Sequence, residues 1–366
     1  MPAPSRVTDP LLSFDVVILA AGEGRRMHSA LPKVLHPVLG LPMLLQVLTV
    51  VGALEPPPDR VVVVIGREGD KVRSAVADWR RDGWLPRWQE KGNGQSRSDA
   101  SRLDFAVQAE QLGTGHAVQQ AGKLLAPAYR SDPATLPDSL NRSDPANRSN
   151  AVAEPGKDDE DDTVAVLYGD VPLITETTLE HLIVTHRTHR PAITLLTAMV
   201  DDPSGYGRII RVAPGGEVFA GGVAPGGSAP AGGVASGGDV GLGVEMVARI
   251  VEDRDATPAE RAIREINAGV YAFRSAWLWP ALAGLAPAPN GEVYLTNLVG
   301  LAIGAGERVV ALRAADADEV MGVNTPEELA KAEGVLRRRS TASGSADPHS
   351  AATRAPTSTA VGLRTA

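Results

Sequence analysis

The stretch DVVILAAGEGRRMHSALPKVLH, residues 15–36, decides the fold. It opens with the apolar, β-branched run Asp15–Ala20 and passes directly into a glycine-containing loop that carries Arg25, Arg26 and Lys33. A short run of this composition is typical of a buried parallel strand. Glycines after such a strand let backbone N–H groups approach an anion, and nearby cations can neutralise phosphate groups. The stretch therefore predicts a strand whose carboxyl end binds phosphate.

This loop matches neither of the two best-known phosphate-binding patterns. It contains no GxxxxGK[ST] string, and Gly22-x-Gly24 is followed by Met27 where a dinucleotide fingerprint has its third glycine. Taken alone, the loop could equally be an ordinary tight turn with surface arginines. Its function therefore has to be argued from the rest of the chain.

Outward from this stretch, β-branched runs alternate with helical patterns. We expect further strands at 61–65, 163–167 and 192–198, and helices at 42–54, 69–79, 115–125 and 176–186. Such alternation is typical of right-handed βαβ units and predicts an α/β fold. Ligands on such sheets bind beyond the carboxyl ends of the strands, so the loops after Ala20 and Leu167 are the candidate sites.

Several stretches are too polar or too rich in Gly, Ala and Pro to bury a core. With these removed, the chain is expected to form one compact domain over 14–335. We predict a flexible N-terminus at 1–13, low-complexity insertions at about 91–101, 137–162 and 214–243, and a disordered tail at 336–366.

Composition excludes several classes of function. Lys and Arg number 36 against 44 Asp and Glu, a net charge of −8, which argues against a general nucleic-acid binder. The absence of Cys excludes disulfides, thiolate nucleophiles and cysteine-based zinc sites. Apolar stretches fall short of the roughly 18–20 residues that cross a bilayer, and Met1–Ser13 lacks the apolar segment of a signal peptide. We expect a soluble, cytoplasmic protein with neither a nucleic-acid nor a membrane partner.

The whole string L-A-A-G-E-G-R-R-M-x(4)-P-K-V-L-H resembles the signature of sugar-nucleotide pyrophosphorylases. More specifically, the chain is similar to the uridylyltransferase domain of bacterial bifunctional N-acetylglucosamine-1-phosphate uridylyltransferase/glucosamine-1-phosphate acetyltransferase. Further motifs follow in the order of that family: QAEQLGTGHA (108–117), LYGDVPL (167–173), GYGRI (205–209), IVE (250–252), EINAG (265–269) and GVN (322–324). The resemblance spans about residues 14–333 and implies a Rossmann-like nucleotide-diphospho-sugar transferase fold, with a mixed, mostly parallel sheet and helices on both faces.

Asp170 is the best candidate for a metal ligand. It follows the predicted strand 163–167, where a carboxylate can hold a hard cation such as Mg²⁺ against substrate phosphates. The alternative, an Asx turn at the loop entry, is a common use of Asp. The other motifs favour the metal, and the resemblance implies Asn324 as the second ligand. The acidic run 158–162 is expected to be a solvated surface instead.

Gln108 carries both a donor and an acceptor, which suits the edge of a uracil base, and Gly113 and Thr114 can offer unobstructed backbone groups. Thr114 could also cap the helix that follows. The resemblance implies that nucleotide and sugar phosphate are bound by the loop after the first strand and by polar residues from the later motifs, namely Leu19, Ala20, Ala21, Gly22, Lys33, Tyr168, Gly169, Gly207, Glu252, Asn267 and Asn324.

The reaction implied by the resemblance is UTP + N-acetyl-α-D-glucosamine 1-phosphate → UDP-N-acetylglucosamine + diphosphate, with Mg²⁺ as cofactor, for the synthesis of cell-envelope precursors. Arg26 and Lys33 are the expected catalytic residues and stabilise charge on the triphosphate. No histidine is assigned a catalytic role, because a phosphate monoester with a second pKa of about 6 is already largely dianionic at neutral pH.

Two positions depart from the family pattern: Arg25 replaces a usual Thr, and Asn297 stands where an Asp is common. No hexapeptide repeats follow Glu333, so we expect no acetyltransferase activity, a monomer, and a separate acetyltransferase in the same pathway. Two alternatives stay open. One is a related nucleotidyltransferase for another base or sugar phosphate; the other is a catalytically silent regulator that binds a sugar nucleotide.

Overall fold

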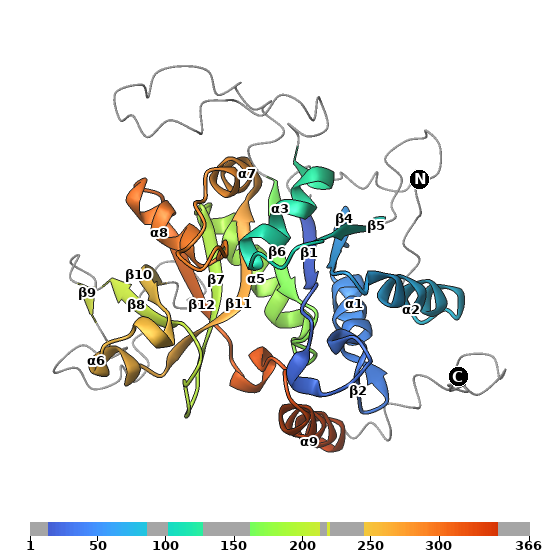
Figure 1. The fold of residues 1–366 in the computed structure, drawn as a ribbon. Helices are drawn as coiled ribbons and strands as arrows, with labels where there is room; N and C mark the ends of the chain where they lie inside the picture. Colours follow the sequence, from blue (N-terminus) through green and yellow to red (C-terminus); the bar gives the residue numbers. More distant parts are fainter. Residues whose placement is uncertain (1–13, 86–101, 127–161, 213–217, 220–244, 343–366) are drawn as a thin grey trace, which may run out of the picture.

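The computed structural model describes residues 14–85, 102–126, 162–212, 218–219 and 245–342 (Figure 1). The predicted flexible N-terminus and nearly all of the three predicted insertions lie outside these residues. One exception corrects a prediction. Val218 and Phe219, inside the insertion predicted at 214–243, form a two-residue strand paired with residues 211 and 212. Valine and phenylalanine are residue types with a high preference for strands.

Within the described residues, the core of the fold is a ten-stranded sheet in the order β5-β4-β1-β6-β11-β7-β12-β10-β8-β9 (Figure 1). The strands are β1 (Phe14–Ala20), β4 (Arg60–Ile65), β5 (Arg102–Val107), β6 (Thr163–Tyr168), β7 (Ile193–Met199), β8 (Arg208–Val212), β9 (Val218–Phe219), β10 (Glu245–Val251), β11 (Glu265–Arg274) and β12 (Val309–Arg313). Strands β9, β10 and β11 run opposite to the others. The predicted mixed, mostly parallel sheet is confirmed.

Helices cover both faces of this sheet. One face carries α1 (Met43–Ala53), α2 (Gly69–Arg81) and α5 (Glu176–His189), and the other carries α3 (Thr114–Leu125), α7 (Ser275–Ala283) and α8 (Asn297–Gly304). The remaining helical segments are η2 (Arg25–Met27), η3 (Lys33–Leu35), η5 (Asp253–Asp255), α6 (Pro258–Arg261), η6 (Ala317–Val320) and α9 (Pro326–Ala342). Among the described residues, no helix is both long and apolar enough to cross a membrane.

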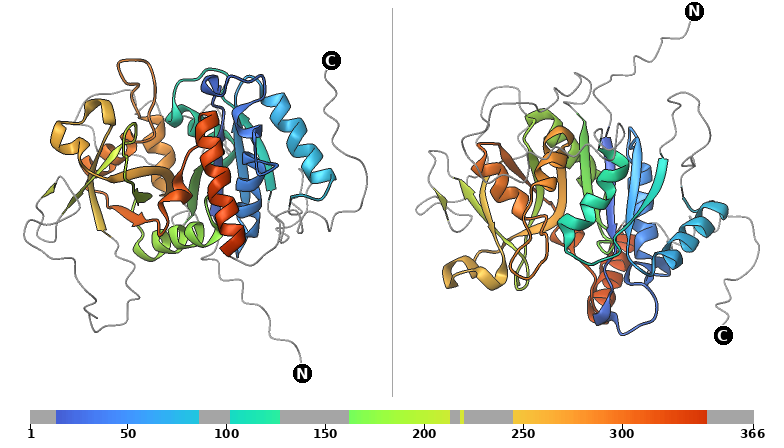
Figure 2. Two further views of the ribbon diagram at one scale, coloured as in Figure 1. Left: turned by 90° about the horizontal axis from the view of Figure 1, so that it is seen from below. Right: turned by 45° about the horizontal axis from the view of Figure 1, so that its top comes forward.

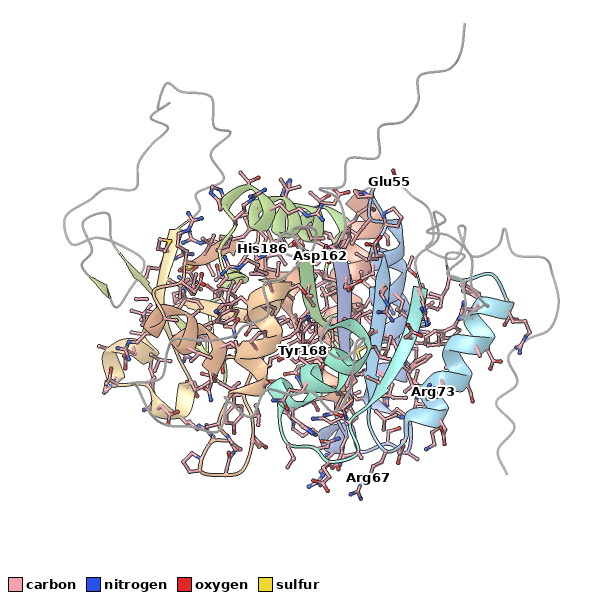
Figure 3. The ribbon with its side chains drawn as sticks, turned by 90° about the horizontal axis from the view of Figure 1, so that it is seen from above. Glu55, Arg67, Arg73, Asp162, Tyr168 and His186 are labelled. Carbon is pink, nitrogen blue, oxygen red and sulfur yellow. The ribbon has the colours of Figure 1, made fainter. Side chains whose placement is uncertain are left out.

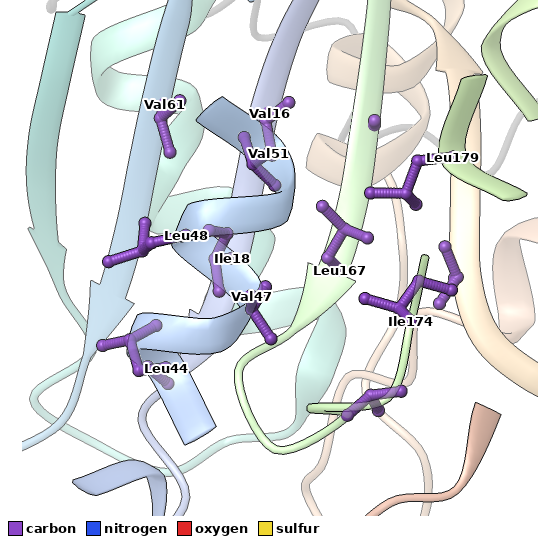
Figure 4. Close-up of a cluster of buried hydrophobic side chains, with 14 of the residues drawn as sticks. Val16, Ile18, Leu44, Val47, Leu48, Val51, Val61, Leu167, Ile174 and Leu179 are labelled. Carbon is purple, nitrogen blue, oxygen red and sulfur yellow. The ribbon is translucent and has the colours of Figure 1, made fainter. Parts of the chain in front are cut away.

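Strand β1 shows why the sequence forms this layered core. Successive side chains of a strand point to opposite faces, so Val16 and Ile18 pack on the side of α1 while Val17 and Leu19 pack on the side of α3. Figure 4 shows Val16 and Ile18 against the apolar side of α1. Each buried aliphatic side chain contributes about 1.5–3 kcal/mol. Burial on both faces therefore explains the uninterrupted apolar run that marked this strand in the sequence.

The C-terminal helix α9 lies beside elements from the beginning of the chain (Figure 2). Its residues Ala332 and Val335 pack in one cluster with Val38, from the short hairpin β2 (Pro37–Val38) and β3 (Leu41–Pro42), and with Met43. The loop before α9 is thereby held near the end of β1.

Helix α9 also corrects the predicted end of the domain. It runs to Ala342, whereas a disordered tail was expected from residue 336. Leu336 packs against the buried cluster below the helix. Arg339 donates a hydrogen bond to the carbonyl of Leu173 (2.8 Å) and pairs with Asp316 (2.9 Å). These tertiary contacts stabilise a last turn whose Arg- and Ser-rich sequence gives no sign of burial.

Candidate functional site

The candidate site lies at the carboxyl edge of β1 and β6. The two strands are parallel neighbours, with Leu19 opposite Tyr168. The backbone N–H of Gly169 donates to the carbonyl of Leu19 (2.9 Å), which joins the ends of the two strands. The loop after Ala20 and the loop that contains Asp170, both named as candidate sites from the sequence, are therefore side by side.

The glycine loop after β1 folds tightly onto the segment that contains Lys33. Gly24 has φ = 63°, and a Cβ atom on it would lie 2.6 Å from Cβ of Lys33. Only glycine combines this left-handed conformation with so close an approach. Its neighbours Arg25–Met27 form η2, and η3 begins at Lys33. Gly24 therefore sets the distance between the two short helices that carry the cationic side chains.

The two adjacent arginines of this loop differ. Arg25 pairs with Glu23 (2.5 Å), and both side chains are well exposed. Arg26 is exposed and makes no hydrogen bond or ion pair with any residue that the structure describes. The charge of Arg25 is thus already matched by a carboxylate, whereas Arg26 can reach a bound phosphate without breaking a protein contact.

Lys33 does not lie free beside the loop. Its ammonium group donates to the carboxylate of Asp170 and to Oδ1 of Asn324, the latter at 2.8 Å. The side chains of Lys33 and Asp170 are only 11% and 13% exposed. Residues from three distant parts of the sequence therefore converge on one half-buried position that holds a positive charge.

Backbone contacts hold the Asp170 and Asn324 loops together. The N–H of Val323 donates to the carbonyl of Asp170 (2.9 Å). Glu328, in the first turn of α9, accepts from the N–H groups of Asn324 (2.5 Å) and Thr325 (3.1 Å). The hydroxyl of Thr325 accepts from the N–H of Glu328 in return (3.2 Å). This reciprocal capping arrangement fixes the direction in which the chain at Asn324 enters helix α9.

The oxygens of Asp170 and Asn324 suit a magnesium ion. A carboxylate and an amide carbonyl are hard ligands, and their convergence on one ammonium group shows that they can share one cation. In the described part of the chain no group of three or more His, Cys, Asp or Glu side chains gathers to hold a metal. A Mg²⁺ ion that binds substrate phosphates needs few protein ligands, because the phosphates and water molecules supply the others.

The predicted base-binding residues gather beside the glycine loop that follows β1. Gln108 follows β5, is 4% exposed, and its N–H donates to the carbonyl of Ile65 (2.8 Å). Its side-chain amide donates to the carbonyl of Gly113 (2.9 Å). Gly113, not Thr114, is the N-cap residue of α3, and the hydroxyl of Thr114 accepts from the N–H of Leu295 (3.0 Å). Thr114 therefore ties α3 to the segment before α8 instead of capping its own helix.

Two residues of this region were not singled out from the sequence. The amide of Gln111 donates to the carbonyl of Ala21 in the glycine loop after β1. His116, on the first turn of α3, contacts the side chain of Gln108. Both lie within the QAEQLGTGHA string, so the motif located them, but only the fold shows which atoms they contact.

The predicted sugar-binding residues form a second group. The N–H of Asn267 donates to the carbonyl of Gly207 (2.8 Å). A Cβ atom on Gly207 would lie 3.7 Å from Oε2 of Glu252 and 3.8 Å from Cβ of Asn267. A Cβ atom on Gly269 would lie 2.8 Å from the ring of Tyr168. The ends of β6, β8, β10 and β11 therefore bring these residues into one region.

Electrostatics keep the tyrosines of the site neutral. Burial, followed by the nearby charge of Asp170, raises the pKa of Tyr168 well above its ordinary value. Burial, with the charges of Glu328 and Asp170, likewise raises the pKa of Tyr206. Both phenols remain protonated around neutral pH and can donate hydrogen bonds to a ligand.

A cavity of about 610 Å³ lies at the opposite edge of the sheet. Phe14, Thr163 and His186 line it, at the beginnings of β1 and β6 and on α5, and it contains none of the predicted site residues. In Figure 3, Glu55, Asp162 and His186, which all line this cavity, lie at one edge and Arg67 at the other. Of the acidic run 158–162, only Asp162 is described, and it lies at this cavity and not at the candidate cation position.

Comparison with known proteins shows which family the chain matches. Residues 16–208 match the MobA-like NTP transferase domain. The chain is similar to proteins named "Bifunctional protein GlmU". It is 34% identical to that of Brevibacillus brevis, and the match covers 88% of this chain and 51% of the relative. The identity is 37% to that of Burkholderia multivorans, covering 89% of this chain and 52% of the relative, and 38% to that of Pelotomaculum thermopropionicum, covering 90% and 53%. The chain thus spans about half the length of these curated relatives.

A solved structure of UDP-glucose pyrophosphorylase complexed with UDP-glucose has a similar fold. Its TM-score is 0.57 at 14% sequence identity, and the match covers 90% of this chain and 100% of that one. The predicted Rossmann-like nucleotide-diphospho-sugar transferase fold is confirmed.

Proposed function

The chain belongs to the MobA-like NTP transferase family, and we propose that it is a UDP-N-acetylglucosamine pyrophosphorylase. The proposed reaction is UTP + N-acetyl-α-D-glucosamine 1-phosphate → UDP-N-acetylglucosamine + diphosphate. Similarity to the GlmU proteins over nearly the whole chain supports this choice of substrates. The candidate nucleotide, sugar and cation residues also meet at one edge of the sheet, as this reaction requires.

The observation that carries the proposal is the convergence of Lys33, Asp170 and Asn324 beside the loop that bears Arg26. Nucleotidyl transfer brings together two highly charged phosphate substrates. Its catalysis consists mainly of positioning and of stabilising negative charge. A largely buried position for a cation, beside an arginine that has no partner among the described residues, supplies the charges that such a reaction needs.

In the proposed reaction, a phosphate oxygen of the sugar phosphate attacks the α-phosphorus of UTP in line. The new P–O bond forms as the bond from the α-phosphorus to the bridging oxygen breaks, and diphosphate leaves with that electron pair. The attacking phosphate is largely dianionic at neutral pH, so no side chain has to remove a proton. Arg26 and Lys33 would stabilise the charge on the triphosphate and on the departing diphosphate.

Asp170 and Asn324 would hold Mg²⁺ at the position that the Lys33 ammonium occupies. When bound there, Mg²⁺ supplies positive charge that lowers the repulsion between the two substrates. Lys33 donates to the same two side chains, so its ammonium group and Mg²⁺ would compete for them. The flexible Lys33 side chain would then be able to turn toward the triphosphate.

The sugar-side residues offer the hydrogen bonds that an N-acetylhexosamine needs. Glu252 is oriented by the hydroxyl of Thr296, which donates to its Oε1 (3.0 Å), and Oε2 lies on the side of Gly207. A carboxylate can accept from sugar hydroxyls, and the neutral phenol of Tyr168 can donate. Asn267 donates to the hydroxyl of Tyr271 (2.6 Å), and its Oδ1 accepts from the N–H of Gly269 (3.2 Å). These contacts hold the Asn267 side chain in one orientation.

The test is diphosphate release by the purified chain with Mg²⁺. UTP, CTP, GTP and dTTP are each paired with the 1-phosphates of N-acetylglucosamine, glucosamine and glucose. We expect turnover with UTP and N-acetylglucosamine 1-phosphate to exceed every other pair. A different preferred pair would keep the reaction type and replace the substrates. Tight binding of UDP-N-acetylglucosamine without diphosphate release from any pair would instead support a silent sugar-nucleotide-binding regulator.

A further inference from the structure

The nitrogen and the oxygen of the Gln108 side-chain amide differ in their hydrogen bonding. Nε2 lies 2.9 Å from the carbonyl oxygen of Gly113 and 3.2 Å from Nδ1 of His116. Within the described ranges, no hydrogen bond reaches the other half of the amide, its carbonyl oxygen. Gln108 is 4% exposed, so its donor half is anchored in the protein and its acceptor half is left for a ligand.

The chemistry of the neighbours settles which half is which. A backbone carbonyl can only accept, so the amide atom beside Gly113 must be the NH₂ group. That same NH₂ group faces Nδ1 of His116, which must then be the unprotonated ring nitrogen. The neutral imidazole then carries its proton on Nε2, which lies 2.9 Å from Nε2 of Gln120. The Gln120 amide donates to the carbonyl of His116 only at 3.3 Å, and its oxygen accepts from the exposed Lys123 (2.7 Å), so this amide can turn its oxygen toward the Nε2 proton more easily than the buried Gln108 can turn.

His116 therefore matters for the orientation of Gln108. Gly113 occupies one hydrogen of the NH₂ group and His116 the other. If the amide turned by 180°, its oxygen would face the Gly113 carbonyl and the lone pair of Nδ1, and both contacts would become repulsive. With both partners present, only one orientation is favourable.

We propose that His116 is a positioning residue for base selection, because it fixes the amide of Gln108 with its carbonyl oxygen directed to the base. This inference rests on the proposed function, in which Gln108 faces the base of the nucleotide. Uracil has an N3–H that a fixed carbonyl oxygen can accept, whereas N3 of cytosine is itself an acceptor. A fixed Gln108 thus favours a base with N3–H and disfavours cytosine.

The structure offers a matched pair of variants for the test. His116→Asn places a carbonyl oxygen close to the position of Nδ1 and so keeps an acceptor for Gln108. His116→Phe keeps a ring on α3 and removes the acceptor. The full-length chain and both variants are assayed for kcat/KM with UTP and with CTP, at fixed Mg²⁺ and saturating N-acetylglucosamine 1-phosphate. Binding of each nucleotide without the sugar phosphate is measured in parallel by calorimetry.

We expect His116→Phe to lower the ratio of UTP to CTP specificity by about tenfold, the effect of one misplaced hydrogen bond to a buried group. The change should reside mainly in KM and in nucleotide affinity, because among the described residues His116 hydrogen-bonds with Gln108 and Gln120 and not with the glycine loop or the proposed cation position. His116→Asn should restore most of the preference for UTP.

Each other outcome overturns a distinct claim. If His116→Phe keeps the wild-type preference in both assays, the positioning role is wrong. If His116→Asn and His116→Phe lose the preference equally, the ring serves packing and not amide orientation. If the wild-type chain does not prefer UTP to CTP, the proposed base is wrong, and this inference fails with it. If the wild-type chain prefers UTP and both variants keep that preference, only this inference is wrong.

Discussion

Arg25 and Arg26 are adjacent in the sequence and differ in what surrounds them. The Arg25 guanidinium lies against Glu23, and Arg26 meets no partner among the residues described. An unpaired arginine on a phosphate-binding loop can bind phosphate through several hydrogen bonds at once. The contrast makes the two residues a matched pair for measuring what a single charge contributes.

We expect Arg26→Ala to lower kcat by about 10²–10³, the cost of losing one preorganised charged donor at a developing charge. Thermal stability should hardly change, because surface substitutions usually cost less than about 0.5 kcal/mol. Steady-state kinetics and a melting curve check both statements, with Arg25→Ala as the control for loss of charge in the same loop. Near-normal turnover of Arg26→Ala would remove Arg26 from the catalytic residues.

Lys33 occupies the position proposed for a metal ion. In Lys33→Ala, Asp170 and Asn324 lose the ammonium group that occupies them. We expect the nucleotide-free variant to bind Mn²⁺ or Mg²⁺ about tenfold more tightly, because a competing positive charge has been removed, and to turn over about 10²–10³ more slowly. Calorimetry or Mn²⁺ paramagnetic resonance measures the affinity. Lys71→Ala, an exposed lysine on α2, is the control, and unchanged metal affinity in Lys33→Ala would contradict the competition.

At the scale of elements, the site depends on loops that are fixed by the structures following them. The Asn324 loop is held by the first turn of α9, and the Thr114 segment is held by the residues before α8. The helix ends thus direct the side chains of these loops. Substitutions in the first turn of a helix should therefore affect binding at a distance from the substituted atoms.

Glu328 tests this dependence. Its carboxylate accepts from two backbone N–H groups, including that of Asn324. We expect Glu328→Ala to lower the free energy of unfolding by about 1–2 kcal/mol, as for loss of a helix cap, and to weaken Mg²⁺ binding because Asn324 is less well oriented. Chemical denaturation and calorimetry measure the two effects. Lys331→Ala, on the exposed side of the same helix, should change neither. Normal metal affinity in a destabilised Glu328→Ala would restrict Glu328 to a structural role.

At the scale of the whole molecule, the sheet separates two edges with different properties. The carboxyl edge of β1 and β6 holds the charged site, and the amino edge holds the cavity lined by Phe14 and His186. His186 is buried against the sheet, and its Nδ1 contacts the hydroxyl of Thr194 (2.9 Å). Burial, with the charges of Arg274 and Arg187, lowers the pKa of His186 to about 3.

This buried histidine predicts a pH dependence of stability. An unfolded histidine has a pKa of about 6.5, so below that pH the unfolded state binds a proton that the folded state does not. The free energy of unfolding should therefore fall as pH drops below 6.5, by up to about 1.4 kcal/mol per pH unit, until the folded pKa is reached. Denaturation between pH 7 and 5 measures the slope. His186→Gln should flatten it, and His181→Gln, an exposed neighbour on α5, should not. An equal slope in His186→Gln would assign the effect to other groups.

Much of the fold could be predicted from local sequence patterns. The β-branched run of β1 and the helical patterns of α1, α2, α3 and α5 gave elements whose ends differ from those expected by at most three residues. Their side-chain periodicity records which faces are buried, and this information lies within a few neighbouring positions. The placement of Asp170 after β6 followed from the same local pattern, because the residue after a parallel strand lies at the ligand-binding edge.

The later strands were harder to predict. Strands β5 and β10 each follow residues outside the described ranges, and β8, β11 and β12 were not predicted as elements, although motifs were found in β8, β10 and β11. Strands β10 and β11 run antiparallel to their neighbours, so no regular βαβ alternation marks them in the sequence. Their residues pair with strands far along the chain, and a local pattern does not carry that information.

Local sequence patterns were enough to predict the first strand, its glycine loop, the helices that alternate with the early strands and the residue types available for phosphate and cation binding. Only the tertiary structure decided which of these residues touch. Lys33 meets Asp170 and Asn324 across 137 and 291 positions of sequence, and the amide of Gln108 takes its orientation from a histidine on the next helix. The physical reason is that a strand or helix follows from side-chain periodicity over a few residues, whereas a hydrogen bond between distant residues exists only once the sheet has brought their loops to the same edge.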